Sequence, residues 1–515
     1  MFSSRLPTDL DPSPFFAELE AAKAEVRAAC ESAACGDFAA GAAARGEDCA
    51  AIVGARKDCA SFIDMTVSSP LRVGLPFDLE PAVGEAKADF GTWVADAAGR
   101  KEAREAVAEY YRERGGWFSA EQILLTASTS EAYSILFKAF CDPGDSILTP
   151  MPGYPLLDTL AQLEHVECYP YFLKLAREKE RCLKSGFQNN FGKNQNGVKE
   201  ASSKDDNAHK LTFAAHSSFR FVIDTDSLLS APDNAKILLL VSPHNPTGHC
   251  VSEKEWNEIV SFCEQRNMIL VVDEVFGDYA IDPKVKRSWE FLRRECVNES
   301  RETRDERVDA AHENKTASEV QNANPGVILS EARSAESKDL FAPRASLPKC
   351  PIFWLNGLSK TVGSPQLKLG WMAFYAPEKD FEPIRAALEF VADAYLSVSA
   401  PAQALAKPML MHAAAYEAAI RERLQANWAT LRAVFPGKYC PEVLGGWYAA
   451  LRLGKDDEQL TLRLLREKHV LVQPGFFFDF DEDGWIVVSL LQPPEIFTEG
   501  VRRMLEMQRS SKPEP

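Results

Sequence analysis

Three side chains that could do chemistry follow short apolar runs of the sequence. They are an amide, a carboxylate and an amine: Asn245, Asp273 and Lys360. The runs that precede them are 236–241 (KILLLV), 268–272 (MILVV) and 352–355 (IFWL). Such runs are typical of strands buried on both faces, and open parallel sheets bind ligands beyond the carboxyl ends of their strands. We therefore expect the three side chains to converge on one crevice.

A fourth element could bind an anion. Ser128 is followed three residues later by Glu131, the spacing of a capping box that begins a helix. The first N–H groups of that helix, including those of Thr129 and Ser130, form an anion site beside two hydroxyls. A ligand with a phosphate, a ring nitrogen and an aldehyde would use all four elements.

Each element alone has an ordinary structural explanation. A Ser-x-x-Glu box usually only begins a helix, and the Asn-Pro-Thr-Gly at 245–248 is a common turn. An Asp at a strand end often caps the next helix, and a single Lys is usually solvated. It is the order and spacing of the four elements together that indicate a site.

The elements that must position these residues alternate between helical and extended patterns. Helical spacing covers 103–113 and 254–266, and Ser252 is the predicted cap of the second helix. Buried strands separated by helices predict a mostly parallel sheet in an α/β domain. The pattern then changes to that of a smaller α+β domain. Its helical stretch is 383–433, and its predicted strands are 445–453 and 485–491.

The chain has 515 residues, too many for one small core. We predict a segment, 1–85, that contributes to the small domain, a large domain, 86–385, that holds the site, and a small domain, 386–515. Three stretches are polar or rich in Ala and Gly, and they cannot bury enough apolar surface to order themselves. We interpret them as surface insertions: 30–58, about 175–218 and about 297–348.

Composition argues against several classes of protein. The net charge of −17, from 75 acidic and 58 basic residues, disfavours partners such as nucleic acid or an anionic membrane. No apolar run approaches the ~20 residues that cross a bilayer, and residues 1–14 do not read as a signal peptide. None of the 12 Cys forms a C-x-x-C pair, so no metal site is expected. Reduced thiols favour a cytoplasmic location. No strand runs into G-x-G-x-x-G, which argues against a dehydrogenase.

The segments SPHNPTG (242–248), DEV (273–275) and SK (359–360), in this order, resemble the signature of fold-type-I enzymes dependent on pyridoxal phosphate (PLP). Within that group they are similar to the class I/II aminotransferases of the aspartate aminotransferase superfamily. The most specific segment is SKTVGSPQLKLGW, 359–371. The resemblance covers roughly 62–172, 219–290 and 350–508, and the three insertion-like stretches fall largely outside it.

The resemblance implies a role for each matching residue. Lys360 would form a Schiff base with PLP and later carry the α-proton, and Asp273 would pair with the protonated ring nitrogen. Asn245 would hydrogen-bond the phenolic oxygen, and Tyr154 would stack on the ring. The remaining predicted cofactor-binding residues, most of them for the phosphate, are Ser128, Thr129, Ser130, Phe276, Ser359 and Lys368.

Several positions depart from the family pattern. Phe276 stands where a Tyr usually bonds the phenolic oxygen, which should raise the pKa of the Schiff base; Tyr279 could compensate. Lys368 stands where Arg is usual and lacks its bidentate fork. Gly357 replaces a common Ser. Trp93 replaces the Tyr that commonly reaches in from the neighbouring subunit.

The largest departure concerns the substrate carboxylate. The family usually carries Arg-x-Ser in the strand that reads WIVVSLL here, so Val487 occupies the Arg position. A carboxylate in a dry site needs a charged partner or several donors. Arg72 and Arg452 are candidates, as is Trp93 for substrate contact, although each Arg could equally be an ordinary surface residue. The run FFFDF, 476–480, could line an apolar pocket but is more often core.

We expect an aminotransferase that moves an amino group between an amino acid and a 2-oxo acid. The alternatives are a PLP-dependent lyase of the β-elimination or C–S type on the same fold, and a PLP-binding protein without turnover. The missing Arg motivates the last alternative, and retention of Lys360, Asp273 and Asn245 argues against it. The resemblance also implies a homodimer.

Overall fold

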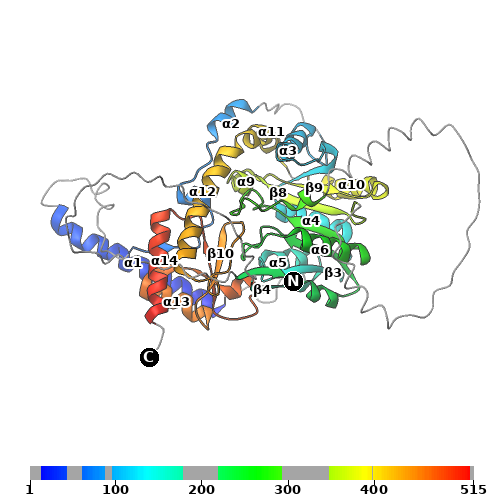
Figure 1. Ribbon diagram of the computed structural model, residues 1–515. Helices are drawn as coiled ribbons and strands as arrows, with labels where there is room; N and C mark the ends of the chain where they lie inside the picture. The colour runs from blue at the N-terminus through cyan, green and yellow to red at the C-terminus, as the bar shows by residue number, and fades with distance from the viewer. Residues whose placement is uncertain are drawn as a thin grey trace, which may run out of the picture.

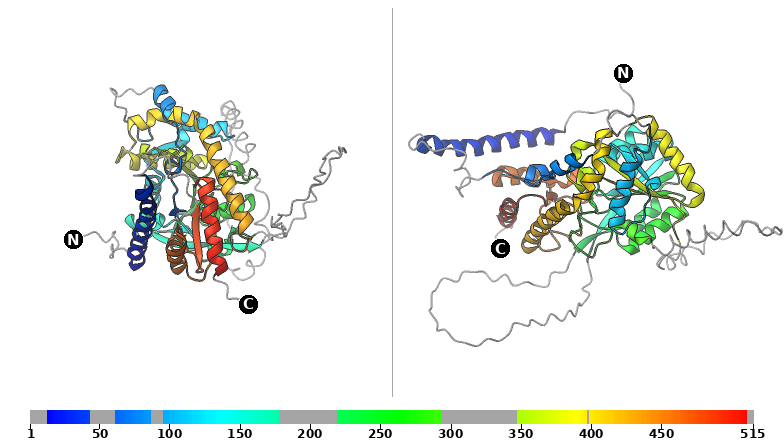
Figure 2. Two further views of the ribbon diagram at one scale, coloured as in Figure 1. Left: turned by 90° about the vertical axis from the view of Figure 1, so that its left-hand side faces the viewer. Right: turned by 90° about the horizontal axis from the view of Figure 1, so that it is seen from above.

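The computed structural model describes residues 13–42, 61–86, 95–177, 219–292, 347–396 and 398–510 (Figure 1). The chain forms a large sheet covered by helices and a smaller group of helices and short strands beside it (Figure 1). Two of the insertion-like stretches, 175–218 and 297–348, lie almost entirely outside the described residues, as does Trp93. Residues 30–42 of the stretch 30–58 are described and continue helix α1 (Pro14–Ala42), so this part is not a separate insertion (Figure 2).

The large sheet has eight strands in the order β2-β9-β8-β7-β6-β3-β4-β5. The neighbours β8-β7-β6-β3-β4 are parallel, whereas β2, β9 and β5 pair antiparallel. The predicted α/β fold with a mostly parallel sheet is therefore confirmed. The strands are β2 (Ile123–Thr126), β3 (Ser146–Met151), β4 (Glu167–Arg177), β5 (Phe219–Ile223), β6 (Ala235–Val241), β7 (Ile269–Asp273), β8 (Ile352–Gly357) and β9 (Gly370–Tyr375).

Each face of this sheet is covered by helices because the central strands are apolar on both sides. In β6, Ile237 and Leu239 pack with one set of helices, and Leu238 and Leu240 pack with the other. The first set is α4 (Thr129–Phe140), α5 (Leu156–Leu163) and α10 (Glu378–Asp393); the second is α3 (Lys101–Glu113) and α6 (Glu253–Gln265). As predicted, Ser252 caps α6 in a capping box with Glu255.

The smaller part is built on a short antiparallel sheet in the order β10-β13-β12. Its helices and those that join it to the large sheet are α11 (Ala400–Met411), α12 (Ala413–Val434), α13 (Asp457–Lys468) and α14 (Pro494–Ser510). Its strands are β10 (Tyr448–Arg452), β11 (Val470–Leu471), β12 (Gln473–Pro474) and β13 (Trp485–Ser489). The two strands predicted here correspond to β10 and β13.

The N-terminal segment joins the smaller part. In α1 (Pro14–Ala42), Phe15 and Leu19 pack against Leu462 and Leu465 of α13, and the two helices lie side by side at the lower left of Figure 1. The strand β1 (Ile63–Asp64) pairs parallel with β11. The proposed boundaries at 85 and 385 remain predictions; the second falls inside α10.

Short elements connect these layers. They are α2 (Glu80–Glu85), α9 (Leu358–Thr361) and the 3-10 helices η1 (Pro70–Val73), η2 (Ala120–Gln122), η3 (Thr225–Ser230), η4 (Ser288–Phe291), η6 (Pro365–Leu367) and η7 (Gly475–Phe478). None of the helices in the described part of the chain is both long and apolar enough to cross a membrane.

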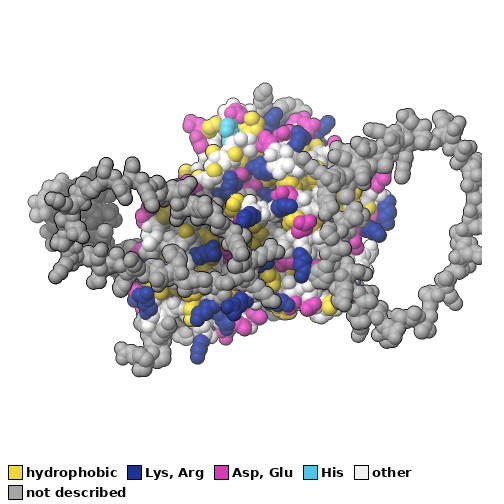
Figure 3. Space-filling view, viewed as in Figure 1, with side chains coloured by type: hydrophobic (Ala, Val, Ile, Leu, Met, Phe, Trp, Pro, Cys, Tyr) yellow, Lys and Arg dark blue, Asp and Glu magenta, His cyan; other side chains and the backbone are white. Residues whose placement is uncertain are grey.

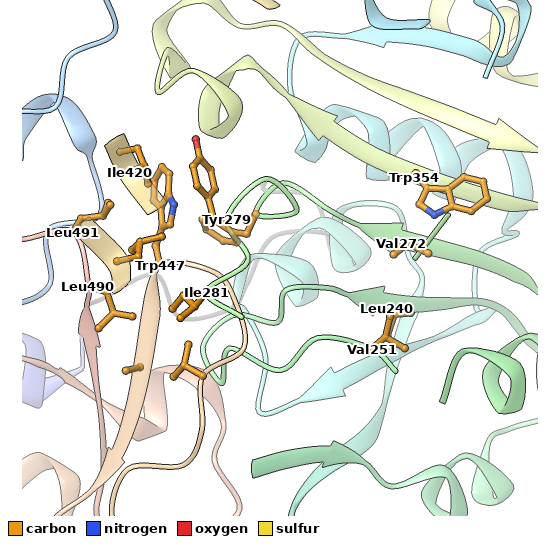
Figure 4. Close-up of a cluster of buried hydrophobic side chains, with 14 of the residues drawn as sticks. Leu240, Val251, Val272, Tyr279, Ile281, Trp354, Ile420, Trp447, Leu490 and Leu491 are labelled. Carbon is orange, nitrogen blue, oxygen red and sulfur yellow. The ribbon is translucent and has the colours of Figure 1, made fainter. Parts of the chain in front are cut away.

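One hydrophobic core runs from the large sheet into the smaller part. Leu240, Val272 and Trp354 lie on the large sheet, and Trp447 and Leu490 lie in the smaller part (Figure 4). All five side chains are buried. This continuous packing holds the strand ends of the large sheet against β10, so the two parts together can enclose a site.

The surface carries both acidic and basic side chains over the face shown in Figure 3.

Candidate active site

The carboxyl ends of β6, β7 and β8 open into one cavity of about 280 Å³, close to the lower end of the range of about 300–1,000 Å³ usual for small-molecule sites. The structure brings Asn245, Asp273 and Lys360 together in its wall. The lining residues are Ser68, Ser128, Thr129, Ser130, Tyr133, Tyr154, Leu156, Leu157, Leu160, Val241, Asn245, Asp273, Val275, Phe276, Gly357, Ser359, Lys360, Gly370 and Tyr448.

The start of α4 forms one end of this cavity. Ser128 is the N-cap, and its hydroxyl accepts a hydrogen bond from the Glu131 N–H at 3.2 Å. The Glu131 carboxylate accepts from the Ala127 N–H at 2.5 Å, one residue earlier than a capping box requires. The next N–H groups, of Thr129 and Ser130, have no acceptor within the helix because they belong to its first turn. They lie beside the hydroxyls of Thr129, Ser130 and Ser359 in the cavity wall.

Asp273 is held in place by two donors. The Tyr133 hydroxyl donates to Oδ2 at 2.7 Å, and the Val275 N–H donates to Oδ1 at 3.0 Å. Burial raises the pKa of Asp273 above its usual value, although both donors and the Lys360 amine favour the charged form. Tyr133 was not predicted from the sequence. Its only local signal is its place one turn after the anion-binding residues of α4.

Lys360 lies in α9 and points into an aromatic corner of the cavity. Its Nζ is 5.4 Å from the ring centre of Phe276 and 5.0 Å from that of Trp447. Burial lowers the pKa of the amine, and the Asp273 carboxylate opposes this only in part. A lowered pKa favours the neutral amine, which is the nucleophilic form.

Hydrogen bonds from Tyr279 hold the backbone of the turn that carries Lys360. The buried Tyr279 hydroxyl donates to the backbone carbonyl oxygens of Lys360 at 2.6 Å and Thr361 at 3.1 Å. The Thr361 hydroxyl in turn donates to Asp278 at 3.1 Å. Tyr279 therefore points away from the cavity, and the suggestion that it replaces the hydroxyl absent from Phe276 is wrong.

The structure shows the surroundings of two positions that depart from the family pattern, Phe276 and Gly357. Phe276 lines the cavity, with its ring 5.2 Å from that of Trp447. Gly357 lies where β8 and β9 approach closely, and a Cβ there would be 2.8 Å from the Cα of Gly370. A Ser at this position would collide with the neighbouring strand.

Tyr154, the residue predicted to stack on the cofactor ring, is 49% exposed and lines the cavity mouth.

The structure does not bring the other candidates to the cavity. Lys368 and Arg72 are exposed and are not lining residues. Arg452 pairs with Glu482 and donates to the Asp483 carbonyl oxygen at 3.3 Å, so its guanidinium is engaged away from the site. Val487 is fully buried in β13.

The aromatic run 476–480 serves packing. Phe476 meets Phe15 of α1 edge-to-face with ring centres 5.2 Å apart, and Phe477 stacks on Phe16 at 5.0 Å. Neither ring lines the cavity. The core interpretation of this run is therefore the one that the structure supports, and the apolar substrate pocket suggested for it is not formed.

The cavity suits PLP in its distribution of donors and acceptors. At one end, a helix N-terminus with hydroxyls matches a phosphate. A carboxylate and an amine stand at the strand ends, and the buried Oδ1 of Asn245 has no hydrogen-bond partner in the protein. A buried polar atom without a partner is costly, so a ligand with a polar group would satisfy it.

Comparisons with known proteins agree with this arrangement. A model of the family described as aminotransferase class I and II matches residues 92–301 and 308–500, which is most of the chain. The glutamate-pyruvate aminotransferase AlaA of Escherichia coli K12 is 21% identical over 418 residues, which cover 78% of this chain and 79% of that protein. The tyrosine aminotransferase of Caenorhabditis elegans is 27% identical over 182 residues, which cover 35% of this chain and only 31% of that protein.

Solved structures share the fold. The alanine aminotransferase from Pyrococcus furiosus aligns with a TM-score of 0.61 and 18% identity, covering 97% of this chain and 100% of that chain. An aspartate aminotransferase variant from Thermus thermophilus aligns with a TM-score of 0.61 and 17% identity, covering 98% of this chain and 99% of that chain. The chain therefore belongs to the class I and II aminotransferase family and is a PLP-dependent aminotransferase acting on an amino acid and a 2-oxo acid.

Proposed function

We propose that the cavity around Lys360 is the site of transamination and that Lys360 is the residue that carries PLP. The observation behind this is the common cavity of Asn245, Asp273, Lys360 and the α4 N-terminus. When bound, PLP supplies a carbonyl carbon that condenses with amines and a ring that accepts negative charge.

The chain's own groups would divide the work by position. Burial lowers the pKa of Lys360, which favours its neutral, nucleophilic form, and its Nζ can accept and return a proton. Asp273, oriented by Tyr133, would hold a protonated ring nitrogen. The Asn245 side chain would bind the phenolic oxygen by donating from its amide NH2, and Phe276 and Tyr154 would cover the ring faces.

The phosphate would lie at the start of α4. Donors there are the N–H groups of Thr129 and Ser130 and the hydroxyls of Ser128, Thr129, Ser130 and Ser359. Helix N-termini favour anions through these N–H groups and the helix dipole. Lys368 stays a predicted phosphate ligand that would have to move, because the structure leaves it exposed.

We also propose that the protein is a homodimer, that it is located in the cytoplasm and that it acts in amino-acid metabolism. The location is supported by the absence of any disulfide among the described cysteines, which suits a reducing compartment. The dimer rests on the family resemblance alone.

The test is the near-ultraviolet and visible absorbance of the protein incubated with PLP, beside Lys360→Ala. A Schiff-base band in the wild type that the variant lacks would establish the attachment residue. If one amino acid abolishes this Schiff-base band and the pyridoxamine spectrum forms, that amino acid is the donor of the amino group. Release of pyruvate and ammonia without an oxo-acid acceptor would instead indicate a lyase. A band of equal strength in Lys360→Ala would refute the assignment.

A further inference from the structure

Three hydroxyl-bearing residues of the cavity lining come from segments other than α4 and the turn of Lys360. Tyr448 is the first residue of β10, Ser68 precedes η1, and Tyr154 follows β3. Three segments that lie far apart in the sequence thus contribute the same chemical group to one cavity. Except for Lys360, no basic side chain is among the described lining residues.

Tyr448 and Lys360 line the same cavity and share an aromatic neighbour, Phe276. The Tyr448 ring meets the ring of Phe276 edge-to-face at 6.0 Å between centres. The Lys360 Nζ lies 5.4 Å from the centre of that same Phe276 ring. A small molecule bound through its amino group near Lys360 would therefore occupy the cavity that Tyr448 also lines.

The Tyr448 hydroxyl is suited to donate a hydrogen bond. Burial raises the pKa of Tyr448 to about 12, and the nearby Tyr154 adds to this, whereas a hydrogen bond with Ser68 lowers it. The phenol is therefore neutral and protonated throughout the physiological range. A neutral donor in a mostly enclosed site binds an anion without the desolvation cost of a buried cation.

The small sheet places Tyr448 on the same face as Val487. Tyr448 pairs directly with Ser489, and Val487 pairs with Ala450. Directly opposed residues of antiparallel strands project to the same side, and so do residues two apart along a strand. The Tyr448 side chain therefore projects from the same sheet face as the Val487 side chain, two residue pairs away along the ladder.

We propose that the Tyr448 hydroxyl donates a hydrogen bond to the carboxylate of the amino-acid substrate and that Ser68, its neighbour in the cavity lining, orients it. This inference rests on the proposed function of the Lys360 site. The class of ligand follows from this donor: a carboxylate is a hydrogen-bond acceptor, and a hydrogen bond to a charged acceptor is stronger than one between neutral groups. The donors at the α4 end are occupied by the phosphate in the proposed arrangement, which leaves Tyr448 for the carboxylate.

The experiment uses the PLP-loaded protein and two amines that cannot lose an α-proton. 2-Aminoisobutyrate carries a carboxylate, and tert-butylamine carries a methyl group in its place. The apparent dissociation constant of each is measured from the change in cofactor absorbance, for the wild type, Tyr448→Phe and Ser68→Ala. Tyr395→Phe is the matched control, because Tyr395 is 53% exposed at the end of α10 and lines no part of the cavity.

Tyr448→Phe should weaken 2-aminoisobutyrate about tenfold and tert-butylamine less than twofold, and Ser68→Ala should have a smaller effect of the same kind. Tyr395→Phe should change neither constant. Equal weakening of both amines, or of neither, would overturn the assignment, as would a changed cofactor spectrum with an unchanged preference for the acid. A wild type without any cofactor band would instead refute the proposed function, so the two failures are distinguishable.

Discussion

Replacing Tyr133 by Phe removes one hydroxyl group and tests whether that hydroxyl stabilises the charged form of Asp273. The Tyr133 hydroxyl donates to Oδ2 of Asp273 at 2.7 Å and is one of two hydrogen bonds to that carboxylate. Its ring packs in the core beneath α4, with a Phe137 ring 6.1 Å away. Phe preserves this packing, so the change removes the hydrogen bond and little else.

The expected magnitude follows from the environment of Asp273. Burial already raises its pKa, and the Tyr133 hydroxyl is a cause that lowers it. A hydrogen bond to a charged acceptor contributes about 1.5–3 kcal/mol, and about 1.4 kcal/mol corresponds to one pH unit, so the acid limb should move up by roughly 1–2 units. The direction is upward because the ionised carboxylate, the form proposed to hold the ring nitrogen, loses its donor.

The assay is the pH profile of kcat/KM, together with the affinity of the protein for PLP from an absorbance titration. Tyr133→Phe should shift the acid limb to higher pH and weaken PLP about tenfold near the limb, with normal activity recovered at higher pH. Tyr395→Phe should leave both unchanged. An unmoved acid limb with unchanged PLP affinity would refute the view that Tyr133 maintains the charge of Asp273.

Gly363→Ala should lower the free energy of unfolding by roughly 2–4 kcal/mol, because the residue has a φ of 60° and a Cβ there would overlap the Tyr416 hydroxyl. In a urea titration, Gly115→Ala, at a φ of 83° with nothing within 4 Å, measures the backbone strain alone; an equal loss in both variants would contradict the overlap. Glu255→Gln should flatten the acid dependence of stability. Burial raises the pKa of Glu255, but His249, with its Nε2 3.2 Å from Oε1, and hydrogen bonds lower it to about 2. The stabilisation is thus present above the unfolded pKa of about 4.5 and is lost as the pH falls through about 2. Parallel urea midpoints for both proteins between about pH 5 and pH 2 would show this to be wrong.

Local patterns were enough to predict much of the fold. The runs 236–241, 268–272 and 352–355 became neighbouring parallel strands. The predicted caps at Ser128 and Ser252 begin α4 and α6. These features depend on alternation, apolar runs and capping within a few residues, which is information that a sequence carries directly.

Other expectations failed because they depended on which way a side chain points. Tyr279 is near Phe276 in the sequence, yet its hydroxyl reaches the Lys360 turn and not the cavity. Arg452 is on the expected strand, but Glu482 and Asp483 engage it at the surface. The separation of two residues in the sequence does not tell which way their side chains point once the strand has ended and the chain turns.

The sequence by itself determined the class of this protein and the three groups at the strand ends, because motif order and strand register place Asn245, Asp273 and Lys360 at the same edge of one sheet. Only the tertiary structure decided what surrounds them. Tyr133 comes from a helix packed over that edge, whereas Ser68 and Tyr448 come from segments held there by the shared core. Their approach depends on contacts between residues hundreds of positions apart, and no local pattern in the chain records such contacts.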